Sequence, residues 1–261
     1  MAEDVLVVTG GASGIGLACA VAMAGDHDAV VLLDRNQEAL DHVVAETPLL
    51  DFTVHGYCCD VTDADGLKDL AGRVDAEVGP VRSLVTSAGI LQNPTTVLDM
   101  DLDEHARVWD VNYHGTVHTV RAFAGAMSKR GRGSIVTLGS INSYAALPLP
   151  AYCPSKTAIL RLTQILAVEL GRHGLRVNGV APTYVLTPAL QARIDAGDRD
   201  PDLIEKAGAV EMFVYPEHIA SVVRFLCSEQ AAAVSGVMMP VDAGWEAATS
   251  YRSFVGGVPW P

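Results

Sequence analysis

The chain has 261 residues, of which 49% are hydrophobic and 19% are charged, and its formal net charge is −13. This balance is typical of a compact folded protein, and the negative charge argues against nucleic acid or an acidic membrane surface as a partner. No run approaches the roughly 20 apolar residues that span a bilayer, and the acidic N-terminus lacks the basic start of a secretory signal, so we expect a cytoplasmic protein.

Most of the chain alternates between short apolar runs and amphipathic stretches. Strands are predicted at residues 5–8, 29–33, 53–59, 83–86, 134–138, 176–180 and 238–241. Helices are predicted at residues 14–24, 37–45, 63–78, 104–129 and 152–173. Apolar strands without alternation are buried on both faces of a parallel sheet, and the helices between them supply the crossovers. The pattern therefore predicts a single-domain α/β fold over residues 1–261: a Rossmann-type doubly wound parallel sheet of about seven strands, with helices on both faces.

Residues 184–216 break this alternation with two or three weak helices and an acidic middle at residues 195–202. An insertion of this length after a strand predicts a lid over a substrate site. We expect its acidic middle to disfavour polyanionic substrates.

The segment Thr-Gly-Gly-Ala-Ser-Gly-Ile-Gly at residues 9–16 directly follows the first predicted strand. Glycines at such a turn let the backbone approach a pyrophosphate, which the helix dipole and free N–H groups then attract. A tight turn without a ligand is the alternative. Asp34 ends the second strand, where a carboxylate accepts hydrogen bonds from a ribose 2′-hydroxyl and repels a 2′-phosphate. This favours NAD, while the neighbouring Arg35 keeps NADP open.

Tyr152 and Lys156 share one face of a predicted helix, because they are four residues apart. A free phenol has a pKa of about 10, and a nearby cation lowers it toward the range of a useful base. Ser140 follows a buried strand and is placed to hold a reacting oxygen. Asn112 is a poor helix former inside a predicted helix, and it fits either a proton relay through a bound water or a kink.

Together these motifs resemble the short-chain dehydrogenase/reductase family over nearly the whole chain. The resemblance implies that Asn112, Ser140, Tyr152 and Lys156 are catalytic. Three segments depart from the family pattern: Thr-Ser-Ala-Gly at residues 86–89 replaces Asn-Asn-Ala-Gly, Pro-Thr at 182–183 replaces Pro-Gly, and Asp-Ala-Gly at 242–244 replaces Asp-Gly-Gly. The spacing from Ser140 to Tyr152 is also one residue shorter than usual.

The motifs and the resemblance together predict a cofactor site. Its residues are Gly10, Ser13, Gly14, Ile15, Gly16, Asp34, Arg35, Asp60, Val61, Ser87, Ala88, Gly89, Tyr152, Lys156, Pro182, Thr183, Val185 and Thr187. Within this set the resemblance assigns Asp60 to the adenine and Thr187 to the nicotinamide carboxamide.

The resemblance implies an NAD-dependent oxidoreductase that moves a hydride between nicotinamide and a secondary alcohol or ketone. Tyr152 would exchange the hydroxyl proton, Ser140 would fix the oxygen, Lys156 would lower the tyrosine pKa and bind the ribose, and Asn112 with water would pass protons to solvent. We expect a polyol, a sugar or a small secondary alcohol as the substrate. The predicted substrate residues are Ser140, Asn142, Tyr144, Leu147, Tyr152, Thr183, Tyr184, Leu190, Met212 and Phe213.

Two other functions stay open. The first is reduction of a 3-oxoacyl thioester on an acyl carrier protein, which would dock on Lys129, Arg130, Arg132 and Arg172 unless these are solvated helix ends. The second is a non-enzymatic NAD-binding scaffold, although a scaffold has no need of all four catalytic residues.

The remaining expectations concern assembly and metals. The resemblance implies a homotetramer or dimer. The apolar tail at residues 251–261, with Phe254 and Trp260, fits a subunit contact or packing on its own subunit. No metal site is predicted, because the five cysteines form no C-x-x-C pair and His114 and His118 lack a third ligand.

Overall fold

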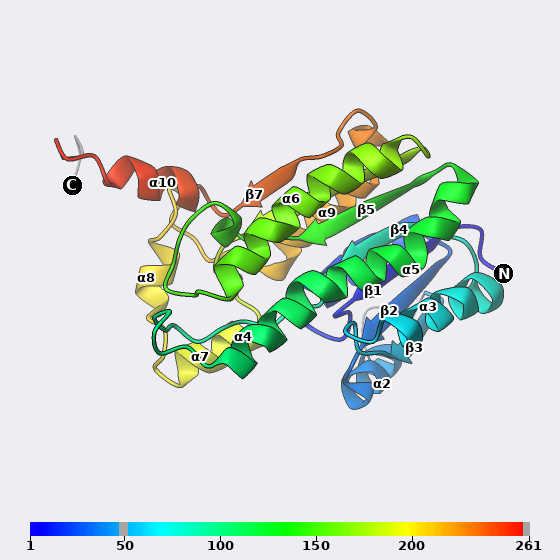
Figure 1. Cartoon of the computed structure of the whole chain (residues 1–261), viewed down its shortest axis with the longest axis horizontal. Coiled ribbons are helices and arrows are strands. Elements are labelled where there is room, and N and C mark those ends of the chain that lie inside the picture. The colour runs from blue at the N-terminus through cyan, green and yellow to red at the C-terminus, as the bar shows by residue number, and fades with distance from the viewer. Residues whose placement is uncertain (47–51, 258–261) are drawn as a thin grey trace.

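The computed structural model describes residues 1–46 and 52–257. Seven strands form one sheet in the order β3-β2-β1-β4-β5-β6-β7 (Figure 1). Every neighbouring pair in this sheet is parallel. The strands are β1 Val5–Thr9, β2 Ala29–Asp34, β3 Val54–Cys58, β4 Val81–Thr86, β5 Gly133–Leu138, β6 Leu175–Pro182 and β7 Met238–Val241. All seven runs predicted as strands are therefore confirmed.

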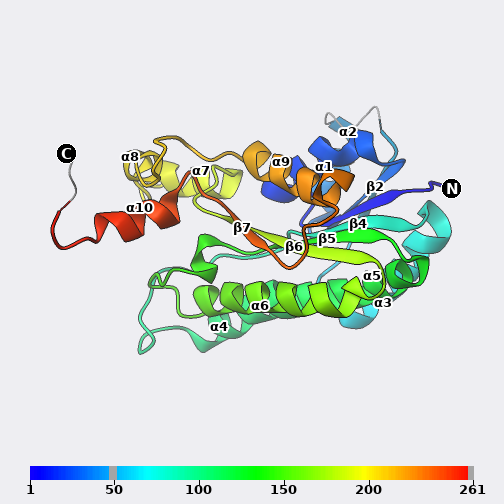
Figure 2. The same cartoon turned by 90° about the horizontal axis from the view of Figure 1, so that it is seen from above.

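Helices connect the strands and form a layer on each face of the sheet (Figure 2). They are α1 Gly14–Met23, α2 Gln37–Glu46, α3 Ala64–Arg73, α4 Leu102–Trp109, α5 Gly115–Arg130, α6 Tyr152–Gly171, α7 Pro188–Asp195, α8 Pro201–Glu205, α9 Pro216–Cys227 and α10 Trp245–Arg252. Short 3-10 or π-helical turns lie at Ala24–Asp26, Val74–Val78, Asp110–His114, Ile141–Ser143 and Glu229–Ala231.

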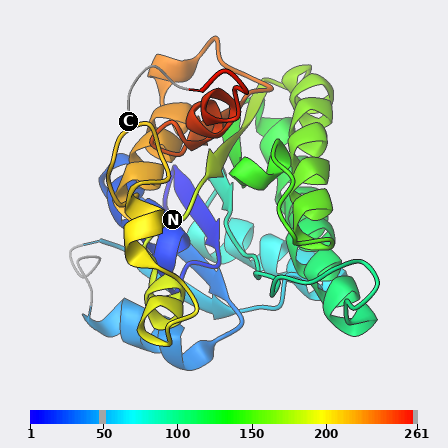
Figure 3. The ribbon, with the colours of Figure 1, turned by 90° about the vertical axis from the view of Figure 1, so that its left-hand side faces the viewer.

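Alternate residues of each central strand enter different hydrophobic cores, as a side-chain period of two requires. Leu6 and Val8 of β1 pack with α1, α2 and α9 on one face. Val5 and Val7 pack with α3, α5 and part of α6 on the other face. Both layers are visible in Figure 3, where the yellow α7–α8 segment and the green helices lie on opposite sides of the sheet. The absence of polar alternation in these strands is thus explained by burial on both faces.

The predicted helix at residues 104–129 was wrong in one detail that bears on the site. Five residues of π-helix, Asp110–His114, separate α4 from α5. A π turn inserts an extra residue into the helical ladder and turns the side chains on either side of it relative to each other. Asn112 occupies this turn and is almost fully buried.

Helices α9 and α10 were not predicted. Helix α9 carries a clear signal, because Ile219, Ala220, Val223 and Leu226 recur at helical spacing and are buried. It packs against α1 in the first core. Two helices in the 184–216 segment, α7 and α8, agree with the weak helices expected there.

The order of connections reverses between β1 and β4, because β2 and β3 lie on one side of β1 and β4 to β7 on the other. Loops leaving the carboxyl ends of these two strands part in opposite directions and leave a crevice where such folds bind ligands. Within residues 1–46 and 52–257, no helix is long and apolar enough to cross a membrane.

Candidate active site

The glycine turn between β1 and α1 has a backbone that side chains would disrupt. Gly10 has φ +64° and Gly14 has φ +52°. A Cβ on Gly16 would lie 2.1 Å from the carbonyl oxygen of Gly10, closer than any real contact. The turn is thus tight because the residue at position 16 has no side chain, which places the N-terminus of α1 at the crevice.

Asp34 is held at the end of β2 by two backbone groups. Its Oδ2 accepts a hydrogen bond from the Ala12 N–H at 3.2 Å, and its Oδ1 accepts one from the Asn36 N–H at 3.1 Å. Asp60 follows β3, and its Oδ1 accepts from the backbone and the hydroxyl of Thr62. Both carboxylates therefore have fixed positions beside the glycine turn.

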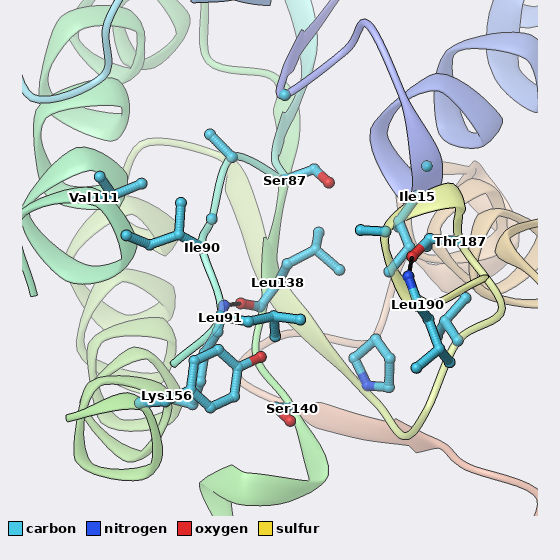
Figure 4. Close-up of a pocket in the computed structure, with 18 of the residues that line it drawn as sticks. Ile15, Ser87, Ile90, Leu91, Val111, Leu138, Ser140, Lys156, Thr187 and Leu190 are labelled. Atoms are coloured by element: carbon cyan, nitrogen blue, oxygen red, sulfur yellow. Dashed lines mark hydrogen bonds between the residues drawn. The ribbon is translucent and has the colours of Figure 1, made fainter. Parts of the chain in front are cut away.

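A cavity of about 630 Å³ joins these elements at the carboxyl edge of the sheet. Figure 4 shows Ile90, Leu91, Leu138, Ser140 and Lys156 on one side of it, and Ile15, Thr187 and Leu190 on the other. Every residue predicted to contact the cofactor lines this cavity. So do Asn112's neighbour Val111 and the predicted substrate residues Ser140, Asn142, Leu147, Tyr152, Thr183, Tyr184 and Leu190.

Tyr152 begins α6, and its partly buried side chain lines this cavity. Burial raises the pKa of Tyr152 to about 12, whereas a hydrogen bond with the Ser140 side chain lowers it. Ser140 follows β5, and its Oγ also accepts from the Asn142 N–H at 3.2 Å. A hydrogen bond within its own loop thus fixes Ser140, and its side chain favours the ionised form of the Tyr152 phenol.

Lys156 lies one helical turn after Tyr152, with its Nζ 5.6 Å from the centre of the tyrosine ring. The Nζ donates to the Leu138 carbonyl at 2.8 Å (Figure 4). Burial lowers the pKa of Lys156 to about 8. The ammonium is directed to the Leu138 carbonyl in this structure, and the expected lowering of the Tyr152 pKa by Lys156 stays a prediction.

Asn112 does not line the cavity; it supports the segment that does. Its Oδ1 accepts from the Ile90 N–H at 2.8 Å, and its Nδ2 donates to the Ile90 carbonyl at 3.0 Å. The side chain therefore pairs with the backbone of the loop after β4 as a neighbouring strand would. The π turn brings this amide to the loop, close to Gly89 and the Lys156 Nζ.

Gln92, on the same loop, is a lining residue that the motifs did not indicate. Its Oε1 accepts from the Ala151 N–H at 2.8 Å and from the Tyr152 N–H at 3.1 Å. These are free N–H groups at the start of α6, so Gln92 caps the helix that carries Tyr152. Its position shortly after Gly89, at the carboxyl end of β4, was the available sequence signal.

The segment at 184–216 contributes α7 to the cavity wall. The Thr187 Oγ accepts from the Leu190 N–H at 3.3 Å and caps α7, and its methyl group faces Gly14. The acidic run at residues 195–202 supplies only one lining residue, Arg199, and α7 supplies Arg193. The charged side chains that this segment adds to the cavity wall are therefore basic, and the expected repulsion of polyanionic substrates by the acidic run stays a prediction.

Three predicted substrate residues lie outside the cavity lining: Tyr144, Met212 and Phe213. The Tyr144 hydroxyl donates to the Met238 carbonyl at 2.7 Å, which holds the ring against β7. The Met212 N–H donates to the Glu205 carbonyl, so this stretch packs on α8. Four residues that were not predicted line the cavity instead. They lie on the loops before α4 and before α6: Leu91, Pro94, Pro148 and Leu149.

Two other predicted sites can be placed. The rings of His114 and His118 stack with centres 6.3 Å apart, and in the described part of the chain no three metal-binding side chains gather. In the C-terminal tail, α10 packs through Trp245 while Phe254 is exposed. Trp260 lies outside the described residues.

Comparisons with known proteins agree with this architecture. A family model described as enoyl-(acyl carrier protein) reductase matches residues 10–246. Galactitol 2-dehydrogenase of Rhizobium johnstonii is 36% identical over 92% of this chain and 93% of its own length. Short-chain dehydrogenase reductase 3a of Arabidopsis thaliana is 35% identical over 92% of this chain and 94% of its own length.

A solved structure of NAD⁺-bound xylitol dehydrogenase superposes with a TM-score of 0.85 at 27% identity, covering 93% of this chain and 98% of that one. The family model and these relatives each match nearly the whole chain, which is enough to assign its family. The chain belongs to the short-chain dehydrogenase/reductase family.

Proposed function

We propose that the protein is an NAD-dependent oxidoreductase that interconverts a secondary alcohol of a polyol or sugar and the corresponding ketone. The observation that carries this proposal is the shared cavity: the Tyr152 phenol and the Ser140 hydroxyl both line it, and the glycine turn and Asp34 form its other end. A proton-transfer group and a dinucleotide-binding turn in one cavity fit hydride transfer.

The cavity fits a nicotinamide dinucleotide. A Cβ on Gly10 would lie 3.0 Å from the backbone of Ala88, so the glycines keep a cradle open between the turn and the loop after β4. Gly10, Gly14 and Gly16 would hold the pyrophosphate, and Lys156 the nicotinamide ribose. The hydroxyl of Thr183 is buried in the cavity wall without a hydrogen-bond partner among the described residues, which also fits a bound polar group.

NAD is favoured over NADP by the fixed carboxylate of Asp34. This charge lies where the second strand ends, and it would repel a ribose 2′-phosphate. Arg35, the residue that follows Asp34, also lines the cavity and would favour the phosphate.

The residues divide the chemistry as follows. When bound, the nicotinamide accepts a hydride from the alcohol carbon or returns it to the ketone carbon. Tyr152 takes the proton that leaves the hydroxyl and gives it back in reduction. Ser140 holds the same oxygen and stabilises charge on it. Asn112 holds the backbone at Ile90 in place and does not itself line the cavity. Any part that it plays in a proton relay is therefore proposed to act through this loop.

Polyols are the favoured substrate class on two grounds. Galactitol 2-dehydrogenase and xylitol dehydrogenase, by their names, act on polyols. The cavity combines apolar walls from Leu91, Leu147 and Leu149 with the side chains of Asn142 and Gln92. Such a lining accepts a carbon chain that carries several hydroxyl groups.

The acyl-carrier alternative has less support. Helices α5 and α6 end at the amino edge of the sheet, so the four basic residues lie at the end opposite the cavity. Arg130 pairs with Asp75 and Arg132 with Asp4, as expected for solvated helix ends. A carrier docked there would hold its acyl chain on the wrong side of the sheet.

We also propose that the chain forms a homo-oligomer. Ile165 and Val168 on α6 and Leu102 on α4 are exposed apolar side chains on one helical layer. Light scattering on the purified protein tests this: a monomer at micromolar concentration contradicts it.

The test of the proposed function is an absorbance screen at 340 nm with NAD⁺ and NADP⁺ against polyols, sugars and simple secondary alcohols. We expect turnover with NAD⁺, and we expect Asp34→Ala to raise the relative use of NADP⁺ at least about tenfold. Turnover with NADP⁺ alone in the wild-type protein would contradict the cofactor assignment. Binding of NAD⁺ without turnover on any member of the panel would favour the scaffold alternative.

A further inference from the structure

Gln92 presents one end of its side-chain amide to the helix that carries Tyr152. The Oε1 accepts two hydrogen bonds, from the N–H groups of Ala151 and Tyr152. An amide rotated by 180° would place an NH₂ group against these two donors. The orientation of the amide is therefore fixed by the helix, and the position of Nε2 follows from it.

The other end of this amide has no partner. Gln92 is 2% exposed, and its Nε2 is buried without a hydrogen-bond acceptor among the described residues. A buried donor without a partner destabilises the folded protein, because it has lost its hydrogen bond to water. Gln92 nevertheless lines the cavity, so a shift of its amide toward a ligand bound there would supply the missing acceptor.

Resting on the function proposed above, we propose that Gln92 determines substrate specificity: its Nε2 donates a hydrogen bond to a hydroxyl oxygen on a carbon next to the reacting one. The reacting oxygen itself is assigned to Tyr152 and Ser140, which line the same cavity. Because Gln92 holds the first residues of α6, its free donor is tied to the same helix end as the Tyr152 phenol. A substrate with two adjacent oxygen atoms satisfies both groups.

The substrate class that follows is the vicinal diol, or the hydroxyketone that forms from it. A simple secondary alcohol of equal length fills the apolar part of the cavity but leaves the Gln92 donor unpaired. A site built to hydrogen-bond a substrate oxygen discriminates against the analogue that lacks it, because the buried polar group then stays without a partner.

The experiment compares butane-2,3-diol with butan-2-ol, which share one carbon skeleton and differ by one hydroxyl group. The readout is the ratio of kcat/KM for the diol to kcat/KM for the mono-alcohol with NAD⁺. Gln92→Glu keeps an oxygen acceptor for the two N–H groups of α6 and replaces the NH₂ donor. It is measured at pH 9, where a carboxylate that accepts two backbone hydrogen bonds is ionised.

We expect Gln92→Glu to lower this ratio about tenfold, mainly through KM for the diol, with a smaller change for butan-2-ol. Gln92→Met removes both ends of the amide and should lower the ratio equally, while it also lowers the melting temperature because the helix cap is lost. The matched control is Gln164→Glu, the same chemical change further along α6 and outside the cavity lining, which should leave the ratio unchanged.

Equal loss on both alcohols in Gln92→Glu would overturn the assignment and leave Gln92 as a helix cap alone. A wild-type ratio near one would also overturn it, because the donor would then read no second oxygen. If the wild-type protein oxidises no alcohol or polyol at all, the proposed function itself is rejected. The variants test the role of Gln92 only when the wild-type protein is active.

Discussion

At the scale of single residues, Lys156 is buried and Tyr152 is partly buried, and burial moves their pKa values in opposite directions. Each group is shifted toward its neutral form, the phenol to about 12 and the ammonium to about 8. A neutral phenol at pH 7 is ready to give its proton to a ketone, whereas oxidation of an alcohol needs the phenolate. The two directions of the reaction should therefore depend differently on pH.

The first prediction concerns Ser140→Ala. The Ser140 hydrogen bond lowers the pKa of Tyr152, so its loss raises that pKa further. The midpoint of the rise of kcat/KM with pH in alcohol oxidation should move to higher pH, and at pH 9 the rate should fall at least about tenfold. A pH profile of the wild-type protein and the variant checks this, and an unmoved midpoint would show that Ser140 does not act on the phenol.

The second prediction concerns Lys156→Met and stability. The folded protein holds Lys156 at a lowered pKa, so below about pH 8 the folded state carries a buried charge that the unfolded chain solvates. The variant should be more stable at pH 7, by about 1–3 kcal/mol, although it loses turnover. The wild-type protein should regain this difference as the pH rises from about 8 to the ordinary lysine pKa near 10.4. Urea denaturation at pH 7 and pH 10 measures both values; a variant less stable at pH 7 contradicts the account.

Some residues of the site were predictable and others were not. Tyr152, Lys156 and the glycines carry a local spacing that reflects their chemistry, so a sequence pattern identifies them. Gln92 carries no such pattern, because its contacts with Ala151 and Tyr152 join loops 59 and 60 residues apart. Tyr144 was misplaced for the same reason: its partner, the Met238 carbonyl, is 94 residues away.

At the scale of elements, the turn between β1 and α1 and the π turn Asp110–His114 position the site. The strands followed from apolar runs buried on both faces, and the helices from their amphipathic spacing. The π turn could not be predicted, since the contact made from it, between Asn112 and the Ile90 backbone, joins residues 22 positions apart. The unfavourable helix propensity of Asn112 was the one local sign of it.

The third prediction compares two glycines in helices. Gly16→Ala places a Cβ against the Gly10 carbonyl, so we expect a loss of about 2 kcal/mol or more in the free energy of unfolding and weaker binding of NAD⁺. Gly72→Ala in α3 has nothing within 4 Å of the added Cβ, and it should stabilise the protein by about 0.5–1 kcal/mol. Urea denaturation distinguishes them, and similar values for the two variants would show that the turn tolerates a side chain.

At the scale of the whole molecule, the sheet order brings together segments that are distant in sequence. The turn after β1, the loops after β4 and β5, the start of α6 and the segment after β6 all meet at one edge of the sheet. One edge of a parallel sheet thus receives the dinucleotide-binding turn, the proton-transfer group and the cover provided by α7. The opposite edge receives paired surface charges such as Arg82 with Asp4 and Glu229.

The central claim is that Tyr152 exchanges the proton during hydride transfer to NAD⁺. The measurement that tests it most directly is NADH formation at 340 nm from a polyol that the wild-type protein oxidises, with Tyr152→Phe as the variant and Tyr57→Phe on β3 as the matched control. We predict that Tyr152→Phe lowers kcat by about a hundredfold to ten-thousandfold at an unchanged melting temperature, while Tyr57→Phe keeps the wild-type rate. Turnover by Tyr152→Phe within a few-fold of the wild-type rate would contradict the account.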